Sequence, residues 1–112
     1  MSLTPNALSV LEKRYIRKDE TGTPIETVKG MFHRVAHHVA QAHTEPGAEH
    51  DALTEVYENM MSNLEFLPNT PTFTGAGTPL GQLAACFVLQ IDDDIGKDSK
   101  SGIFSTLRNA AL

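Results

Sequence analysis

Apolar residues along the first two thirds of the chain recur every three or four positions, the spacing that is typical of amphipathic helices. A helix is predicted to begin with Thr4 as its N-cap and Pro5 in its first position, and to reach Tyr15. A second helix is predicted after the cap residue Thr27, and its apolar positions are Val28, Met31, Phe32, Val35, Ala36, Val39 and Ala40. Because a third stripe occupies residues 52–64, we expect a small antiparallel helical bundle over residues 1–68.

The pattern changes abruptly after residue 68. Residues 69–81 contain four threonines, two prolines and three glycines, a content that predicts a loop without a helix or a long strand. Residues 83–91 are almost entirely apolar, which predicts a buried strand covered on both faces, as in a parallel sheet. A final helix is predicted from Ile103 to Leu112, with no residue to cap its end. Since such a strand needs neighbours and such a helix needs a continuation, we expect the chain to be part of a larger structure.

Length, composition and charge narrow the function classes. The helical spacing predicts a mainly α fold, and a chain of 112 residues with 40% apolar content predicts a single compact domain, too short for a complete barrel or doubly wound enzyme. The net charge of −5 and the absence of a long basic run argue against a nucleic-acid partner. No apolar run approaches the ~20 residues that span a bilayer, and the first residues show no secretory signal. A single cysteine, Cys86, is typical of the reducing cytoplasm.

Three polar patterns could carry chemistry. His33 and His37 stand four positions apart, a spacing that can bind a metal, but no carboxylate occupies a complementary position nearby in the sequence. We therefore interpret them as part of an exposed polar face and predict no metal site. The acidic run 92–94 lacks the alternating oxygen ligands of a calcium loop, so we interpret it as the charged end of the strand. Residues 75–77 resemble half of a phosphate-binding loop, and they form either an anion cradle or an ordinary turn.

Cys86 has two interpretations. A free cysteine within an apolar strand is usually a small hydrophobic residue. This one follows a loop rich in hydroxyls and glycines, where a ligand could approach its sulfur. A thiolate can reduce a bound substrate, but it needs a second thiol to complete a disulfide, and this chain has none.

Residues 69–89 read NTPTFTGAGTPLGQLAACFVL. This segment resembles the signature near the N-terminus of ribonucleotide reductase catalytic subunits, and it is most similar to the adenosylcobalamin-dependent, class II type. The flanking segments agree with the same family in register, and they are Leu3–Ala7, Tyr15, Pro24–Thr27, Gly30–Phe32, Met61–Pro68 and Gly102–Phe104. The chain differs from the family pattern at Thr70 and Ala84, where serine is common, and at residues 73–75, where Leu-Met-Asn is common.

The resemblance implies that residues 1–68 form a helical N-terminal region and that residues 69–112 begin a ten-stranded α/β barrel. It implies that Cys86 is one half of the redox pair that reduces the ribose 2′ position. Thr70 would lie near the substrate phosphates and ribose, and the backbone at Ala84 and Ala85 would help to hold the nucleotide. The other catalytic cysteines and the adenosylcobalamin site would lie on the remaining barrel polypeptide, so no cofactor is expected on this chain alone.

Two function classes follow from these observations. In the first, the chain is a segment of a ribonucleoside-diphosphate or -triphosphate reductase that contributes Cys86 and Thr70 to an active site, and it is inactive by itself. Its partners are then the barrel polypeptide and a ribonucleotide. In the second, the chain is a non-catalytic binding or oligomerisation module derived from the same region. In either case the edge of the predicted strand could pair two copies into a homo-oligomer.

Overall fold

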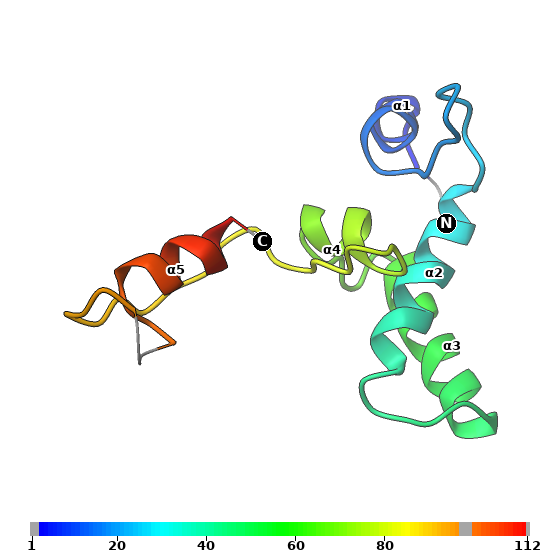
Figure 1. The fold of residues 1–112 in the computed structure, drawn as a ribbon. Coiled ribbons are helices and arrows are strands. Elements are labelled where there is room, and N and C mark those ends of the chain that lie inside the picture. Colours follow the sequence, from blue (N-terminus) through cyan, green and yellow to red (C-terminus); the bar gives the residue numbers. More distant parts are fainter. Residues whose placement is uncertain (1–2, 97–99, 112) are drawn as a thin grey trace.

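The computed structural model describes residues 3–96 and 100–111 (Figure 1), and over these ranges the fold is mainly helical. The helices are α1 (Pro5–Arg14), α2 (Val28–Ala40), α3 (Ala48–Ser62), α4 (Thr70–Gly75) and α5 (Ile103–Ala110). The described residues contain no strand, and their β-pairing is limited to the isolated bridges Lys18–Pro24 and Asp92–Gly102. No helix in these ranges combines the length and the apolar character that a membrane crossing requires.

The two predicted N-caps are confirmed. The Thr4 hydroxyl accepts a hydrogen bond from the Ala7 backbone N–H at 3.2 Å, and the Thr27 hydroxyl accepts one from Gly30 at 3.1 Å. Each bond satisfies a backbone donor that the first turn of a helix leaves unpaired. These caps set where α1 and α2 begin.

The core lies between α2 and α3, which run side by side after a short connection (Figure 1). Its fully buried residues come mainly from α2, and they are Met31, Phe32, Val35, Ala36 and Ala40. Met61 adds the α3 side, and Phe73 and Ala76 close one end. The end of α1 reaches this core through Leu11, Tyr15 and Ile16. The expected three-helix bundle is therefore a helix pair onto which the end of α1 packs.

The expectation that residues 69–81 form no helix is wrong. Residues 70–75 form α4, with Asn69 at the N-cap position and proline in the first turn, where its missing N–H costs nothing. Phe73 is only 6% exposed, so burial of its ring against α2 stabilises this turn of helix. Tertiary packing thus outweighs the low helix propensity of the segment.

The predicted buried strand over residues 83–91 is also wrong. The segment is not paired with any strand of the described chain, and Val88 is completely exposed. A strand needs a neighbour for its backbone hydrogen bonds and cover for its apolar faces, and the described residues provide neither. The start of a barrel is accordingly not seen here.

Residues 90–96 and 100–111 form a separate small unit around α5, which lies away from the helix pair (Figure 1). The buried Thr106 hydroxyl donates to the Gln90 carbonyl at 2.8 Å, which ties the approach segment to α5. The radius of gyration is 18.1 Å, against about 13 Å for a compact domain of this length. The division at residue 68 stays a prediction, although Phe73 and Ala76 pack with the first part. Leu112, the predicted end of the last helix, lies outside the described residues.

Candidate functional site

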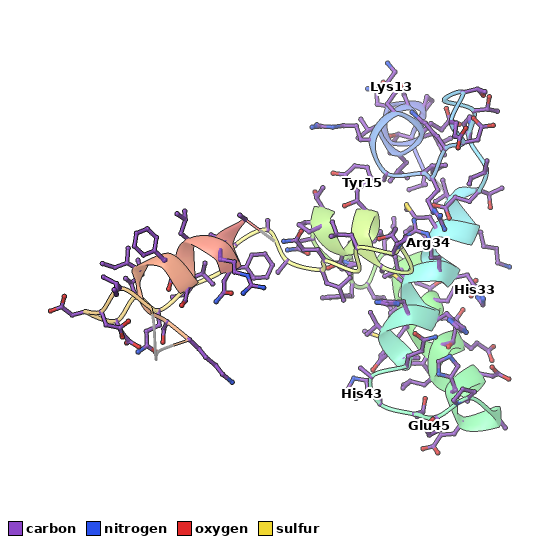
Figure 2. All side chains as sticks on the ribbon, viewed as in Figure 1. Lys13, Tyr15, His33, Arg34, His43 and Glu45 are labelled. Atoms are coloured by element: carbon purple, nitrogen blue, oxygen red, sulfur yellow. The ribbon has the colours of Figure 1, made fainter. Side chains whose placement is uncertain are left out.

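The threonine-rich loop is built around α4, which packs on the end of the helix pair. Phe73 anchors it: its ring meets Tyr15 edge-on at a centroid distance of 6.0 Å and lies 6.0 Å from the Phe32 ring. Tyr15 also reaches the first residue of α4, because its hydroxyl lies 3.0 Å from the Thr70 hydroxyl. Tyr15 and Arg34 both lie close to α4 in Figure 2. Thr70, the predicted substrate residue, is therefore exposed but fixed by the end of α1.

The other threonine hydroxyls of this loop brace it internally. Thr72 lies 2.8 Å from the Asn69 side-chain oxygen and 3.0 Å from the Leu83 carbonyl. Thr74 donates to the Thr70 carbonyl at 3.2 Å, and Thr78 donates to the Gly75 carbonyl at 2.7 Å. These threonine hydroxyls are thus bonded to loop carbonyls, and the anion cradle at residues 75–77 stays a prediction.

The chain returns across α4 at its glycines. A Cβ atom on Gly75 would collide with the Gln82 carbonyl oxygen, so only a glycine allows this close approach. Gly81 makes the turn with φ of +61°, a left-handed conformation that glycine adopts without strain. As a result Gln82 and Leu83 lie directly against the helix that carries Thr70.

Cys86 follows three residues after Leu83, and the structure places it differently from our expectation. Its thiol is free and exposed, not buried within a strand. Ala84 and Ala85 are exposed as well. None of the hydrogen bonds among the described residues joins Thr70 to residues 84–86. The four predicted site residues therefore lie on one continuous piece of chain that is tied to α4 through Thr72 and Leu83, and they do not by themselves enclose a substrate.

Sequence reasoning missed Arg34, the most heavily bonded side chain near this loop. Its side chain is 11% exposed and pairs with Glu26 through two contacts, Nη2–Oε1 at 2.7 Å and Nε–Oε2 at 3.0 Å. Its Nη1 donates to the carbonyls of Phe73 at 3.0 Å and Ala76 at 2.7 Å. Glu26 precedes the cap of α2 and the two carbonyls lie about forty residues away, so no helical spacing rule reveals this cluster.

Glu26 is held in its ionised form. Burial alone would raise the pKa of this carboxyl, but hydrogen bonds from the Arg34 guanidinium and the Arg17 backbone N–H, together with the charge of Arg34, lower the pKa below its ordinary value of 4.5. Because the folded state binds a proton here less readily than the unfolded chain, this pair stabilises the fold above pH 4.5, and the contribution is lost as the pH falls through the folded pKa.

We therefore expect the free energy of unfolding to decrease as the pH is lowered below 4.5. Glu26→Gln should start from a lower stability at neutral pH and lose less of it in acid, because the amide does not titrate. Urea unfolding at pH values on either side of 4.5 measures both slopes. Glu12→Gln, an exposed carboxyl on α1, is the matched control and should follow the parent chain. Equal acid slopes for the parent and Glu26→Gln would contradict this assignment.

The histidines differ in part from their sequence interpretation. His33 does have a carboxylate partner, because its Nδ1 lies 2.8 Å from Glu58 Oε2 on α3, a residue that packing brings across. The His37 ring meets the ring of the buried His50 edge-on at 4.7 Å. Within the described ranges, no three or more histidine, cysteine or acidic side chains are arranged to hold a metal. These contacts join α2 to α3.

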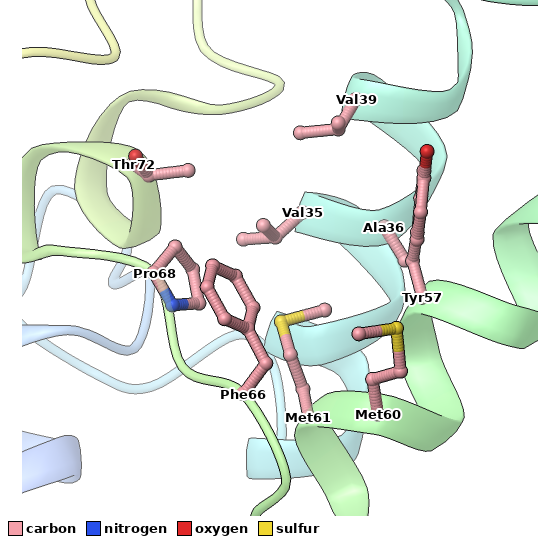
Figure 3. A pocket seen from close by; sticks show the side chains of 9 residues that line it. All are labelled: Val35, Ala36, Val39, Tyr57, Met60, Met61, Phe66, Pro68 and Thr72. Carbon is pink, nitrogen blue, oxygen red and sulfur yellow. The ribbon is translucent and has the colours of Figure 1, made fainter.

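An apolar pocket lies beside α4 (Figure 3). Its volume is about 280 Å³, and it is lined by Val35, Ala36, Val39, Tyr57, Met60, Met61, Phe66, Pro68 and Thr72. Apart from the hydroxyls of Tyr57 and Thr72, this lining offers no group for acid–base or redox chemistry. The pocket suits an apolar side chain, whereas the polar chemistry of the chain lies on α4 and the segment after it.

Comparison with known proteins shows which family this chain resembles in sequence. Residues 1–81 match the family model described as "Ribonucleotide reductase, all-alpha domain". A vitamin B12-dependent ribonucleoside-diphosphate reductase of Mycobacterium tuberculosis is 42% identical over 99% of this chain and 16% of its own length. The protein of the same description in Thermoplasma acidophilum is 33% identical over 100% of this chain and 21% of its own length. The alpha subunit of the Helicobacter pylori ribonucleoside-diphosphate reductase is 33% identical over 94% of this chain and 12% of its own length. No solved structure matches the chain significantly.

Proposed function

The chain belongs to the ribonucleotide reductase family, whose all-alpha domain it matches, and from that membership we propose that it forms the N-terminal part of a reductase catalytic subunit. The complete enzyme converts ribonucleotides into deoxyribonucleotides for DNA synthesis. The observation that carries the proposal is the 42% identity to a vitamin B12-dependent reductase along 99% of this chain. The chain spans only 16% of that relative, so the rest of the catalytic machinery is assigned to further polypeptide.

Cys86 takes the redox role in this proposal. A thiyl radical on the remaining polypeptide removes the ribose 3′ hydrogen, and the 2′ hydroxyl leaves as water. Cys86 and a second thiol of that polypeptide supply two electrons and two protons and become a disulfide; one proton leaves with the 2′ oxygen as water and the other is added at C2′. The 3′ hydrogen then returns from the first thiol to C3′, which regenerates the thiyl radical. An exposed, unpaired Cys86 supports this role, because its sulfur is open to such a partner. Thr70 contacts the phosphates and ribose, and the backbone at Ala84 and Ala85 helps to hold the nucleotide.

Adenosylcobalamin is the cofactor that the vitamin B12-dependent relatives suggest for the complete enzyme. The described residues of this chain do not fit it. The apolar pocket of about 280 Å³ is far smaller than a corrin macrocycle with its nucleotide tail, and its lining has almost no polar partners for that tail. We therefore place the cofactor site on the remaining polypeptide.

Exposed apolar surface supports a missing partner chain. The accessible surface is 8179 Å², against about 6,100 Å² for a compact monomer of 12.2 kDa. Much of the apolar part lies after residue 86, where Phe87, Ile91, Phe104 and Leu107 are each 60–66% exposed. We infer that the remaining reductase polypeptide covers this region. This proposal places the chain in the cytoplasm, where a lone cysteine stays reduced.

Reconstitution tests the proposal. The chain is mixed with a form of the Mycobacterium tuberculosis relative that lacks the matched region, together with adenosylcobalamin, a dithiol and ribonucleoside diphosphates or triphosphates in separate assays. We expect no deoxyribonucleotide from this chain alone and measurable product from the mixture. Product from the isolated chain, or none from both the mixture and a covalent fusion, would contradict the proposal.

Self-association is a second candidate function, which the same exposed apolar residues favour. An uncovered apolar segment and an apolar helix face invite a second copy when no other polypeptide is present. We expect sedimentation velocity to show a concentration-dependent dimer at micromolar concentrations, and Phe104→Ser with Leu107→Ser to weaken it roughly tenfold or more. Ser105→Ala on the half-buried side of α5 is the control. A monomer at all concentrations would exclude this function.

A further inference from the structure

Arg34 joins three parts of the chain that lie far apart in the sequence. On one side its guanidinium holds both carboxylate oxygens of Glu26, and on the other it donates to the carbonyls of Phe73 and Ala76. Those carbonyls belong to the last turn and the C-cap of α4. The last carbonyls of a helix have no partner within the helix, so this cation supplies what the end of α4 lacks.

The contact depends on the shape of an arginine side chain. Three of its nitrogens donate at once in a fixed plane, an arrangement that a lysine ammonium on its flexible stem does not reproduce. The stem is used as well: a Cβ on Gly77 would lie 2.9 Å from Arg34 Cγ, so the backbone leaving α4 passes directly over the side chain. Glu26 orients the Arg34 guanidinium, and the guanidinium fixes the end of α4.

The other end of α4 carries the residues proposed to meet the substrate. Thr70 is its first residue, and Thr72 bonds the Leu83 carbonyl that precedes Ala84, Ala85 and Cys86. With only six residues, α4 has too few internal hydrogen bonds to hold its own place. We propose that Arg34, oriented by Glu26, is a positioning residue that fixes α4 and so sets where Thr70 and the cysteine segment face a ribonucleotide. The part concerning the ribonucleotide rests on the proposed function.

Amide hydrogen exchange on this chain tests the first half of the inference. In Arg34→Met we expect protection of the Phe73 and Ala76 amides to fall roughly ten- to hundredfold relative to the amides of α2. In Arg34→Lys the protection of these amides should lie between that of the parent chain and that of Arg34→Met. This variant replaces Arg34→Met in the test if the methionine variant does not fold. Lys29→Met, an exposed cation on the same helix, is the matched control. Unchanged protection of α4, or an equal loss in α2 and α4, would overturn the inference.

A charge swap separates the carbonyl contacts from the ion pair. The double variant Glu26→Arg with Arg34→Glu restores opposite charges, but position 34 can then no longer donate to the carbonyls of Phe73 and Ala76. We expect α4 to stay as unprotected as in Arg34→Met. Full recovery of α4 protection would show that the ion pair alone matters, and it would overturn the role of the carbonyl contacts.

Kinetics of the reconstituted reductase test the second half. Arg34→Lys should raise the KM for the ribonucleotide roughly tenfold, because Thr70 binds substrate, and it should also lower kcat, because the cysteine segment is displaced together with α4. An unchanged KM, with or without a fall in kcat, would overturn the positioning of Thr70 by Arg34. If the parent mixture makes no product, the proposed function fails and substrate positioning fails with it, whereas hydrogen exchange still decides whether Arg34 holds α4.

Discussion

Replacing Cys86 with serine is expected to abolish ribonucleotide reduction by the reconstituted enzyme and to leave the fold of this chain intact. Serine has nearly the same shape, but its hydroxyl cannot form the disulfide that the proposed redox role requires. Loss of a group that takes part in the chemistry lowers kcat by about a thousandfold or more. Because Cys86 is exposed and packs in no core, the thermal unfolding of the chain should not change.

The neighbouring position offers the control. Ala84→Ser introduces the same hydroxyl two residues earlier, on an equally exposed backbone, and at a position where the family commonly has serine. This variant should retain activity within a few-fold of the parent mixture. Product formation is measured with each variant at saturating partner polypeptide, and binding to that polypeptide is measured separately. A Cys86→Ser mixture that binds its partner and retains most of its activity would remove Cys86 from the redox pair.

Local signals in the sequence were enough to predict the starts of α1 and α2. A threonine cap followed by an apolar stripe is read within a few residues, and Thr4 and Thr27 behave as this pattern indicates. The apolar stripe of α2 likewise predicts the buried face on which the core is built. Such features are determined by neighbours within one or two helical turns, so they can be predicted without knowledge of the tertiary fold.

The sequence predictions are wrong where residues distant in the sequence determine the local structure. α4 forms in spite of its composition because Phe73 finds a site between Tyr15 and Phe32, residues that lie more than forty positions earlier. Residues 83–91 have the apolar content of a strand, yet a strand exists only when another strand pairs with it. Composition therefore shows which residues are apolar but not which of them the fold buries.

The candidate site shows the same division. Thr70 and Cys86 were predicted as site residues through a resemblance that depends on the order of residues, which a sequence displays directly. The cluster of Arg34, Glu26 and the α4 carbonyls depends on the return of the chain over α2, which no spacing rule encodes. The signal available in the sequence was an arginine next to the apolar stripe of a helix. Charged side chains are rarely buried unless they are paired, and the structure shows Arg34 largely buried and paired with Glu26.

Gly75→Ala is expected to lower the free energy of unfolding by about 1–3 kcal/mol, the usual cost of forcing an extra methyl group into a packed site. The new Cβ would collide with the Gln82 carbonyl oxygen, a backbone atom that cannot rotate away as a side chain can. The return segment must then separate from α4, and the contact between Thr72 and the Leu83 carbonyl is lost with it. The same change should therefore reduce the activity of the reconstituted enzyme, because the segment that carries Cys86 is no longer held against α4.

Gly30→Ala is the matched glycine, and it should have the opposite sign. A Cβ there meets Thr27 Oγ1 at 3.5 Å and Glu26 Cβ at 3.6 Å, which are ordinary contacts, so no atom has to move. Alanine within α2 should raise the free energy of unfolding by about 0.5–1 kcal/mol, since it restricts the unfolded chain and favours the helix. Denaturant unfolding of both variants and the parent chain measures the two changes in the free energy of unfolding. If Gly75→Ala proved as stable as Gly30→Ala, the close approach of Gln82 to α4 would not exist in solution, and Cys86 would not be tied to Thr70 through the loop.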